Sequence, residues 1–197
     1  MKQSIIFVLF LLLSTNILSA ADAVAGKNKS IVCGACHGPD GNSFNPVWPS
    51  LAGQNATYLA KQLTDFRDGK RTDVQMAPMA AALTDADIAD IAAYFSSMEL
   101  KSGSTDEKYV ALGSQIYTGG LEGVMACTGC HGPDGAGLEA AGFPQVSSQQ
   151  TQYVINQLNN FKNGIRANDA STMMSSIAAN MSEEQITAVA NYLSGLH

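Results

Sequence analysis

The sequence contains few of the residues that build metal sites and disulfide frameworks. Its 197 residues include four cysteines, three histidines and one tryptophan, and only 14% of them are charged. Lys and Arg number 11 against 17 Asp and Glu, which gives a formal net charge of −6. This shortage of positive charge argues against a nucleic-acid partner. The acidic surface fits either a protein partner with a basic patch or plain solvation.

Long apolar runs are also scarce, and the clearest one lies at the N-terminus. Lys2 precedes an uninterrupted apolar run from Ile5 to Leu13, and small residues follow at positions 19–21. This pattern predicts a secretory signal peptide over residues 1–21, with an uncleaved anchor as the alternative. The run is shorter than the roughly 20 residues that span a bilayer. Without the signal, the chain would carry a formal charge of −7 (10 − 17).

All four cysteines belong to two copies of one motif. C-G-A-C-H at 33–37 recurs as C-T-G-C-H at 127–131, and each copy continues into G-P-D-G. C-x-x-C-H is the attachment signature of c-type haem, since two thiols at this spacing can bond the vinyl groups of one porphyrin. The adjoining histidine then ligates the iron. We therefore predict two covalently bound haem c groups, attached at Cys33, Cys36, Cys127 and Cys130 and ligated by His37 and His131.

Paired cysteines also occur as redox dithiols, disulfides and zinc ligands. Two C-x-x-C pairs together could bind one zinc ion. The histidine that follows both pairs, and the lack of any cysteine outside them, favour haem over these alternatives.

The two halves of the chain resemble each other well beyond the motifs. Cys127 follows Cys33 by 94 positions (127 − 33), and other equivalent positions lie 95 to 98 apart. The pattern indicates a tandem duplication of one unit, with too few copies for a solenoid. We expect domains over residues 22–100 and 101–197, joined by a Ser-, Lys- and Gly-rich linker. Recurring pairs include Trp48-Pro49 with Phe143-Pro144, Tyr58 with Tyr153, Gly69 with Gly164 and Arg71 with Arg166.

Each copy is predicted to be all-α, because no stretch shows the sustained alternation of a strand. The middle helix of the first copy has Leu59, Leu63 and Phe66 on one face and ends near Gly69. The last helix opens with T-x-x-D at 84–87, and its counterpart with the capping box S-x-x-Q at 182–185. A first helix is expected over 106–117 in the second copy and after position 22 in the first.

A low-spin cytochrome iron needs a second axial ligand, and methionine is the usual alternative to histidine. Only His197 lies outside the motifs, and one histidine cannot serve two haems. Met76 and Met174 lie 98 positions apart (174 − 76), each before the last helix of its copy. We predict that they ligate the two irons. Met79 and Met173 are the nearby alternatives, and any of these methionines could simply fill a core.

Several repeated residues have two open interpretations each. Pro39 and Pro133 could offer a backbone carbonyl to the proximal imidazole, or could be ordinary turn prolines. Arg71 and Arg166 could pair with haem propionates, or could be solvated surface charges. Ordinary packing in haem pockets is expected for a set of four aromatic residues: Trp48, Phe143, Tyr58 and Tyr153.

These residues together resemble cytochrome c4, a family of two-domain dihaem cytochromes c of the bacterial periplasm. The resemblance covers nearly all of the chain after the signal. The second copy departs from the first at 146–148, where V-S-S replaces the L-A-G of 51–53, and this change affects a loop and no proposed ligand. The resemblance rests on V-C-G-A-C-H-G-P-D-G-N at 32–42, L-A-G-Q at 51–54, D-G-K-R-T at 68–72, G-F-P at 142–144 and G-L-H at 195–197.

The resemblance implies two class I cytochrome c domains related by a pseudo-twofold axis, with haem propionates approaching each other at the interface. It also implies electron transfer, without catalysis, from the quinol-oxidising complex toward a haem-copper terminal oxidase. Loose association with the inner membrane is part of the same expectation. The alternatives are a dihaem peroxidase, which needs an open iron site, and the electron-entry subunit of a larger redox complex.

Overall fold

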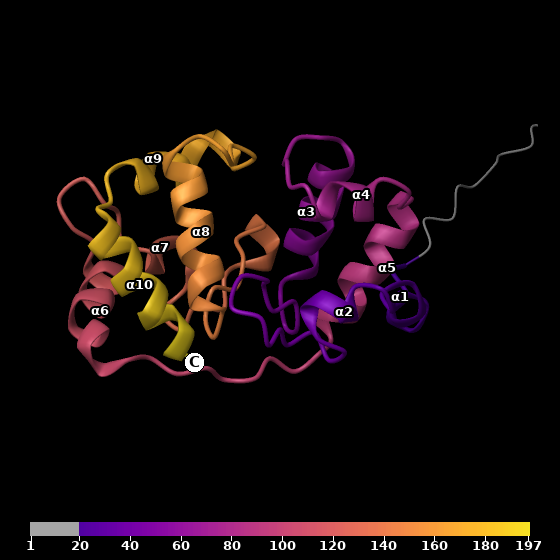
Figure 1. Cartoon of the computed structure of the whole chain (residues 1–197), viewed down its shortest axis with the longest axis horizontal. Helices are drawn as coiled ribbons and strands as arrows, with labels where there is room; N and C mark the ends of the chain where they lie inside the picture. Colours follow the sequence, from indigo (N-terminus) through magenta and orange to yellow (C-terminus); the bar gives the residue numbers. More distant parts are fainter. Residues whose placement is uncertain (1–19) are drawn as a thin grey trace, which may run out of the picture.

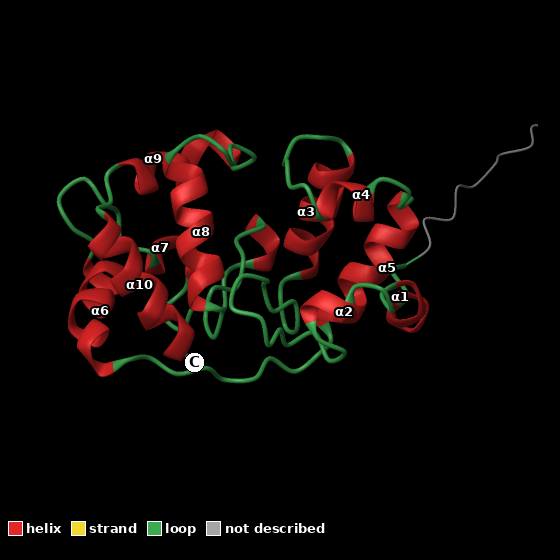
Figure 2. Cartoon of the chain, in the orientation of Figure 1, coloured by secondary structure: helices red, strands yellow, loops and turns green. Residues whose placement is uncertain are grey.

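The computed structural model describes residues 20–197, and within that range it is all-α (Figure 2). The described part contains no strand, only two isolated β-bridges, Leu121–Val124 and Leu138–Phe143. Figure 1 shows two halves side by side along the long axis, with the linker running along one edge. The prediction of an all-α chain with two tandem domains is confirmed. Residues 1–19 of the expected signal peptide lie outside the described range.

The first domain contains three longer helices that match the predicted ones and two short helices between them. The short helices were not predicted, because four or five residues show too little periodicity. In chain order the elements are α1 Ala23–Lys29, α2 Gly34–His37, α3 Ala56–Arg67, α4 Met76–Ala80 and α5 Asp85–Ser96.

The second domain repeats this order with added 3₁₀ turns. The helix expected from position 106 begins as a 3₁₀ turn and becomes α-helical only at Val110, while Asp106 accepts a hydrogen bond from the backbone N–H of Lys108. The elements are η1 Glu107–Tyr109, α6 Val110–Gly119, α7 Thr128–His131, η2 Glu139–Ala141, α8 Thr151–Lys162, η3 Ala170–Thr172, α9 Met173–Ala179 and α10 Glu183–Gly195.

The ends of the longer helices follow the local sequence signals. Thr84 and Ser182 each form a complete capping box at the start of α5 and α10. Past the ends of α3 and α8, Gly69 and Gly164 have φ of 73° and 71°, a left-handed conformation that a side chain would strain.

The first and last helices of each domain cross at a glycine. A Cβ on Gly26 would lie 2.0 Å from the carbonyl oxygen of Asp90, and one on Gly113 would lie 2.4 Å from the Cβ of Tyr192. The backbones of α1 and α5, and of α6 and α10, therefore pack too closely for any side chain. The two glycines are 87 positions apart (113 − 26), so the second domain has seven more residues (94 − 87) between its first helix and its C-x-x-C-H motif.

Each domain has its own apolar core. In the first domain the core lies between α3 and α5 and includes Leu59, Ile91 and Phe95. The larger core of the second domain joins α6, α8 and α10 and includes Ile116 and Ile186, both fully buried. Two separate cores are consistent with duplicated units that pack independently. Among the described residues, no helix is both long and apolar enough to span a membrane.

Candidate haem-binding sites

Each C-x-x-C-H motif forms a single helical turn. In α2 the backbone N–H groups of Cys36 and His37 donate to the carbonyl of Cys33 at 3.1 and 2.9 Å. In α7 those of Cys130 and His131 donate to Cys127 at 3.2 and 2.9 Å. Residues three apart in a helical turn share a face, so both thiols of a pair point to one side. All four thiols are free and partly exposed, which is inconsistent with a disulfide in either motif.

The two motif histidines are buried and held by backbone carbonyls. His37 and His131 are 7% and 8% exposed. The Nδ1 of His37 donates to the carbonyl oxygen of Pro49 at 2.9 Å, and that of His131 to Pro144 at 2.9 Å. Because a carbonyl can only accept, Nδ1 holds the hydrogen and Nε2 keeps the lone pair that can bind iron.

Burial also sets the charge of these imidazoles. It lowers the pKa of both His37 and His131, although the carbonyl hydrogen bonds act in the opposite direction. The imidazoles are therefore neutral at physiological pH, the form that ligates a metal.

The hypothesis that Pro39 and Pro133 supply these carbonyls is wrong. Pro39 lies only two residues beyond His37, past a glycine with φ of 84°, and the chain must loop back for 12 residues before Pro49 reaches the ring. The sequence repeat already pointed to Pro49 and Pro144 as alternative sources of these carbonyls, because the two prolines are equivalent positions that each follow an aromatic residue.

The cysteines do not form a zinc site. The two pairs belong to different domains (Figure 1), and the described residues contain no group of three or more His, Cys, Asp or Glu side chains that could hold a metal ion. Burial raises the pKa of the Cys33 thiol and raises that of Cys127 to about 11. Both are protonated at neutral pH, whereas zinc binds the thiolate.

The predicted methionine ligands occupy comparable places in the two domains. Met76 is the first residue of α4 and Met174 the second of α9, each before the last helix of its domain as expected. Both are partly buried, whereas the alternatives Met79 and Met173 are 47% and 36% exposed. Met174 also packs against the core of its domain. Burial favours the predicted pair, and their role as ligands stays a prediction.

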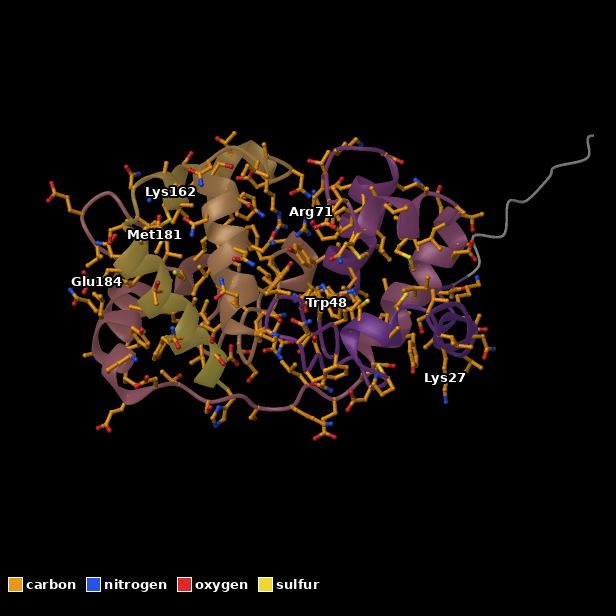
Figure 3. The ribbon with its side chains drawn as sticks, viewed as in Figure 1. Lys27, Trp48, Arg71, Lys162, Met181 and Glu184 are labelled. Carbon is orange, nitrogen blue, oxygen red and sulfur yellow. The ribbon has the colours of Figure 1, made fainter. Side chains whose placement is uncertain are left out.

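Arg71 and Arg166 meet at the boundary between the domains, where Figure 3 shows Arg71 on the side of the first domain that faces the second. They are only 9% and 7% exposed. Arg71 donates to the side-chain oxygen of Gln62 in its own domain at 2.8 Å and of Gln157 across the boundary at 2.7 Å. Arg166 mirrors this, donating to Gln157 at 2.9 Å and across to Gln62 at 3.1 Å. The interpretation of these arginines as solvated surface charges is therefore wrong.

Tyr58 and Tyr153 complete this interdomain cluster. Arg166 donates to the hydroxyl of Tyr58 at 2.8 Å, and Arg71 to that of Tyr153 at 3.3 Å. Burial acts to raise the pKa of Tyr58, but the charges of Arg166 and Arg71 outweigh it and the pKa lies below its ordinary value. Both hydroxyls thus contribute to domain packing, a role that sequence reasoning missed because the contacts are between the two copies.

The other expected pocket residues also form polar contacts. The Trp48 indole N–H donates to Gln75, the residue before Met76, at 3.2 Å (Figure 3 labels Trp48). The Phe143 carbonyl accepts from Asn55 of the first domain at 2.6 Å. Their packing against haem stays a prediction.

The residues present fit a covalent haem in each domain. Each motif places two free thiols and one neutral imidazole, with its lone pair on Nε2, on a single turn. A partly buried methionine follows in the same domain. This donor set is the one found in c-type cytochromes.

Comparison with known proteins supports this assignment. The cytochrome c family model matches residues 23–99 and again 110–197. Cytochrome c4 of Pseudomonas aeruginosa is 50% identical over 182 residues, which cover 91% of this chain and 90% of that protein. A thiosulfate dehydrogenase electron acceptor of Stutzerimonas stutzeri is 35% identical over 85% of this chain and 80% of its own length.

A solved structure agrees with these relatives. The crystal structure of reduced recombinant cytochrome c4 from Pseudomonas stutzeri superimposes with a TM-score of 0.88 at 43% identity, covering 90% of this chain and 100% of that one. The chain therefore belongs to the cytochrome c family and, within it, to the cytochrome c4 electron-transfer proteins, which bind two covalent haem c groups.

Proposed function

We propose that this protein carries single electrons in the periplasm, from the quinol-oxidising complex of the respiratory chain toward a haem-copper terminal oxidase. The observation that carries the proposal is the equivalent donor set of the two domains. In each, a buried neutral histidine and a partly buried methionine would both ligate the haem iron. Such an iron has no vacant site for a substrate, which favours a carrier over an enzyme.

The roles of individual residues follow from their contacts. Haem iron supplies a one-electron couple when bound. Cys33, Cys36, Cys127 and Cys130 would attach the two groups, and His37, Met76, His131 and Met174 would ligate the irons. The carbonyls of Pro49 and Pro144 fix the imidazole planes, and burial of both histidines keeps water away from them.

The proposed location and domain limits complete this assignment. Export would depend on a signal peptide over residues 1–21, followed by domains over 22–100 and 101–197. Loose association with the inner membrane would keep the carrier near its partners.

A second electron donor is suggested by one group of relatives. The similarity to a thiosulfate dehydrogenase electron acceptor makes a thiosulfate-oxidising enzyme the second candidate. Both proposals keep the same site and differ only in the donor. A dihaem peroxidase and the electron-entry subunit of a larger complex remain the alternatives from other classes.

Partner kinetics test the route. The oxidised protein is mixed in a stopped-flow instrument with a quinol–cytochrome c reductase and quinol, or with a thiosulfate dehydrogenase and thiosulfate. The reduced protein is mixed with a haem-copper oxidase. Fast reduction by the first system and fast oxidation by the oxidase support the respiratory route, whereas fast reduction by the thiosulfate enzyme alone supports the second candidate. Rapid carbon monoxide binding at one haem, or sustained peroxide consumption, would instead identify a peroxidase.

A further inference from the structure

The residues that follow the two histidine-binding prolines are each held by a glutamine from the other domain. Ser50 follows Pro49, and its backbone N–H donates to Oε1 of Gln149 at 2.8 Å. The Nε2 of Gln149 donates back to the carbonyl of Ser50 at 3.0 Å. One side-chain amide of the second domain thus pairs with both backbone groups of a residue in the first.

The second domain shows the same contact in reverse. Gln145 follows Pro144, and its backbone N–H donates to Oε1 of Gln54 at 2.8 Å. The Nε2 of Gln54 donates to the carbonyl of Gln145 at 2.8 Å. Gln54 and Gln149 are 95 positions apart (149 − 54), as are Ser50 and Gln145 (145 − 50), so the pair of contacts obeys the repeat.

These contacts connect each glutamine to a histidine through one peptide group. The carbonyl of Pro49 accepts from His37, and the N–H of the same peptide group, which belongs to Ser50, donates to Gln149. Hydrogen bonds at the two ends of a peptide group polarise each other, so the Gln149 oxygen makes the Pro49 carbonyl a stronger acceptor. A stronger acceptor draws the Nδ1 hydrogen of His37 and makes the imidazole a better electron donor to iron.

The surroundings make this coupling effective. Gln54 and Gln149 are only 6% and 8% exposed, and Ser50 is 5% exposed, so water competes little for these bonds. Each glutamine is also fixed at the start of a helix. The backbone N–H of Asn55 donates to Gln54 at 3.0 Å, and that of Gln150 to Gln149 at 2.9 Å.

We infer that Gln54 and Gln149 are positioning residues that tune, each in the opposite domain, the hydrogen bond on the proximal histidine and so the reduction potential of that haem. The inference rests on the proposed ligation of iron by His37 and His131. It makes the potential of each haem depend on the docking of the domains. Separation of the domains would remove both glutamine contacts together and raise both potentials.

The test is a crossed pair of substitutions in the intact dihaem protein. Gln149→Leu removes the contact to Ser50, so the Pro49 carbonyl becomes a weaker acceptor and ferric iron in the first domain is less stabilised. The reduction equilibrium of that haem should shift about three- to tenfold toward the ferrous state, a rise of about 30 to 60 mV. The haem of the second domain, where the substitution lies, should change far less. Gln54→Leu should do the reverse, raising the potential of the haem in the second domain and changing that of the first far less.

Gln150→Leu is the matched control. Gln150 is next to Gln149 and also crosses the boundary, but its side chain donates to the carbonyl of Ser43 and not to the peptide group between Pro49 and Ser50. It should leave both potentials nearly unchanged. Redox titration followed by NMR of assigned haem methyl signals resolves the two haems. The inference would be overturned if the potential shifts mainly at the haem of the substituted domain, or equally at both haems. It would also be overturned if Gln150→Leu shifts the potentials as much as Gln149→Leu.

A second measurement separates this inference from the ligation on which it rests. In the ferrous protein labelled with ¹⁵N-histidine, both ring Nδ1–H signals should be visible. In Gln149→Leu the His37 signal should move upfield and exchange faster with water, with His131 unmoved. Loss of low-spin haem signals in His37→Ala tests ligation by itself. If Gln149→Leu does not fold, Gln149→Asn, shorter by one methylene, should move the same haem in the same direction, and no shift in that variant would overturn the inference.

Discussion

The hydroxyl of Tyr58 accepts a hydrogen bond at 2.8 Å from Arg166, a residue 108 positions away in the other domain. Arg71 and Tyr153 repeat the relationship at 3.3 Å. A buried guanidinium is costly unless its donors are paired, and these partners come from both domains. Each domain therefore depends on the other to satisfy its own buried cation.

Removal of one arginine should weaken this dependence. Arg166→Leu leaves the Tyr58 hydroxyl without its donor and removes one of the two arginine donors to Gln157. We expect the free energy of unfolding to fall by about 2 to 3 kcal/mol. Unfolding should also tend to separate into two steps, because the domains stabilise each other less. Denaturant titration followed by helical circular dichroism and haem absorbance measures both effects. Lys70→Ala removes an exposed cation and should change stability by about 0.5 kcal/mol or less.

The methionine ligands can be tested separately in each domain. Met76→Ala and Met174→Ala should each abolish the sulfur-to-iron charge-transfer band of one ferric haem and lower the potential of that haem, since a thioether favours ferrous iron. Absorbance spectra and redox titration measure these changes. The exposed neighbours supply the controls, and Met79→Ala and Met173→Ala should keep both bands. Loss of a band only in the controls would show that the other methionine of each pair is the ligand.

The helix crossing in the second domain predicts a contrast between two glycines of α6. Gly113→Ala places a methyl group 2.4 Å from the Cβ of Tyr192 and 2.6 Å from the carbonyl of Ala188, and should destabilise the protein by about 1 to 3 kcal/mol. Gly119→Ala meets nothing within 4 Å and should be neutral or stabilise by about 0.5 kcal/mol. Thermal unfolding of the two variants measures the difference, and equal destabilisation would contradict the close crossing.

Acid should remove a specific contribution to stability from the first domain. Lys29 pairs with Asp87 and with Asp90, each at 2.7 Å. The pKa of Asp87 lies well below its ordinary value, chiefly through the hydrogen bond from Lys29, and that of Asp90 is lowered by the backbone N–H of Asp22 and then by Lys29. Because these pKa values are depressed on folding, the stabilisation is present above about pH 4 and is lost as pH falls through the lowered values.

Lys29→Met tests this contribution. The variant should melt below the wild-type protein at pH 7, and the difference should shrink steadily between about pH 4 and pH 2. Melting temperatures across that range measure it. Lys27→Met, on the same helix, is the matched control, and its melting temperature should differ from that of wild type by an amount that does not shrink as pH falls. A difference between Lys29→Met and wild type that stays constant with pH would assign the effect to packing.

Local signals in the sequence predicted the parts of the fold that depend on neighbouring residues. The capping boxes at Thr84 and Ser182 and the glycines after α3 and α8 mark helix ends within a few residues, and the motifs predict the haem attachment sites. The carbonyls of Pro49 and Pro144 were missed because the chain brings them back over 12 and 13 residues. The environment of the arginines was missed because their partners lie in the other copy, where periodicity and spacing carry no information.

The glutamine contacts across the boundary are made to main-chain atoms, so they place little demand on the side chains they meet. Position 50 is a serine and position 145 a glutamine, yet both are held in the same way. The two copies can therefore diverge at these positions and still recognise each other, provided neither becomes proline, which lacks the N–H group. A docking mode of this kind lets a duplicated protein change the surface of one domain at a time without losing its assembly.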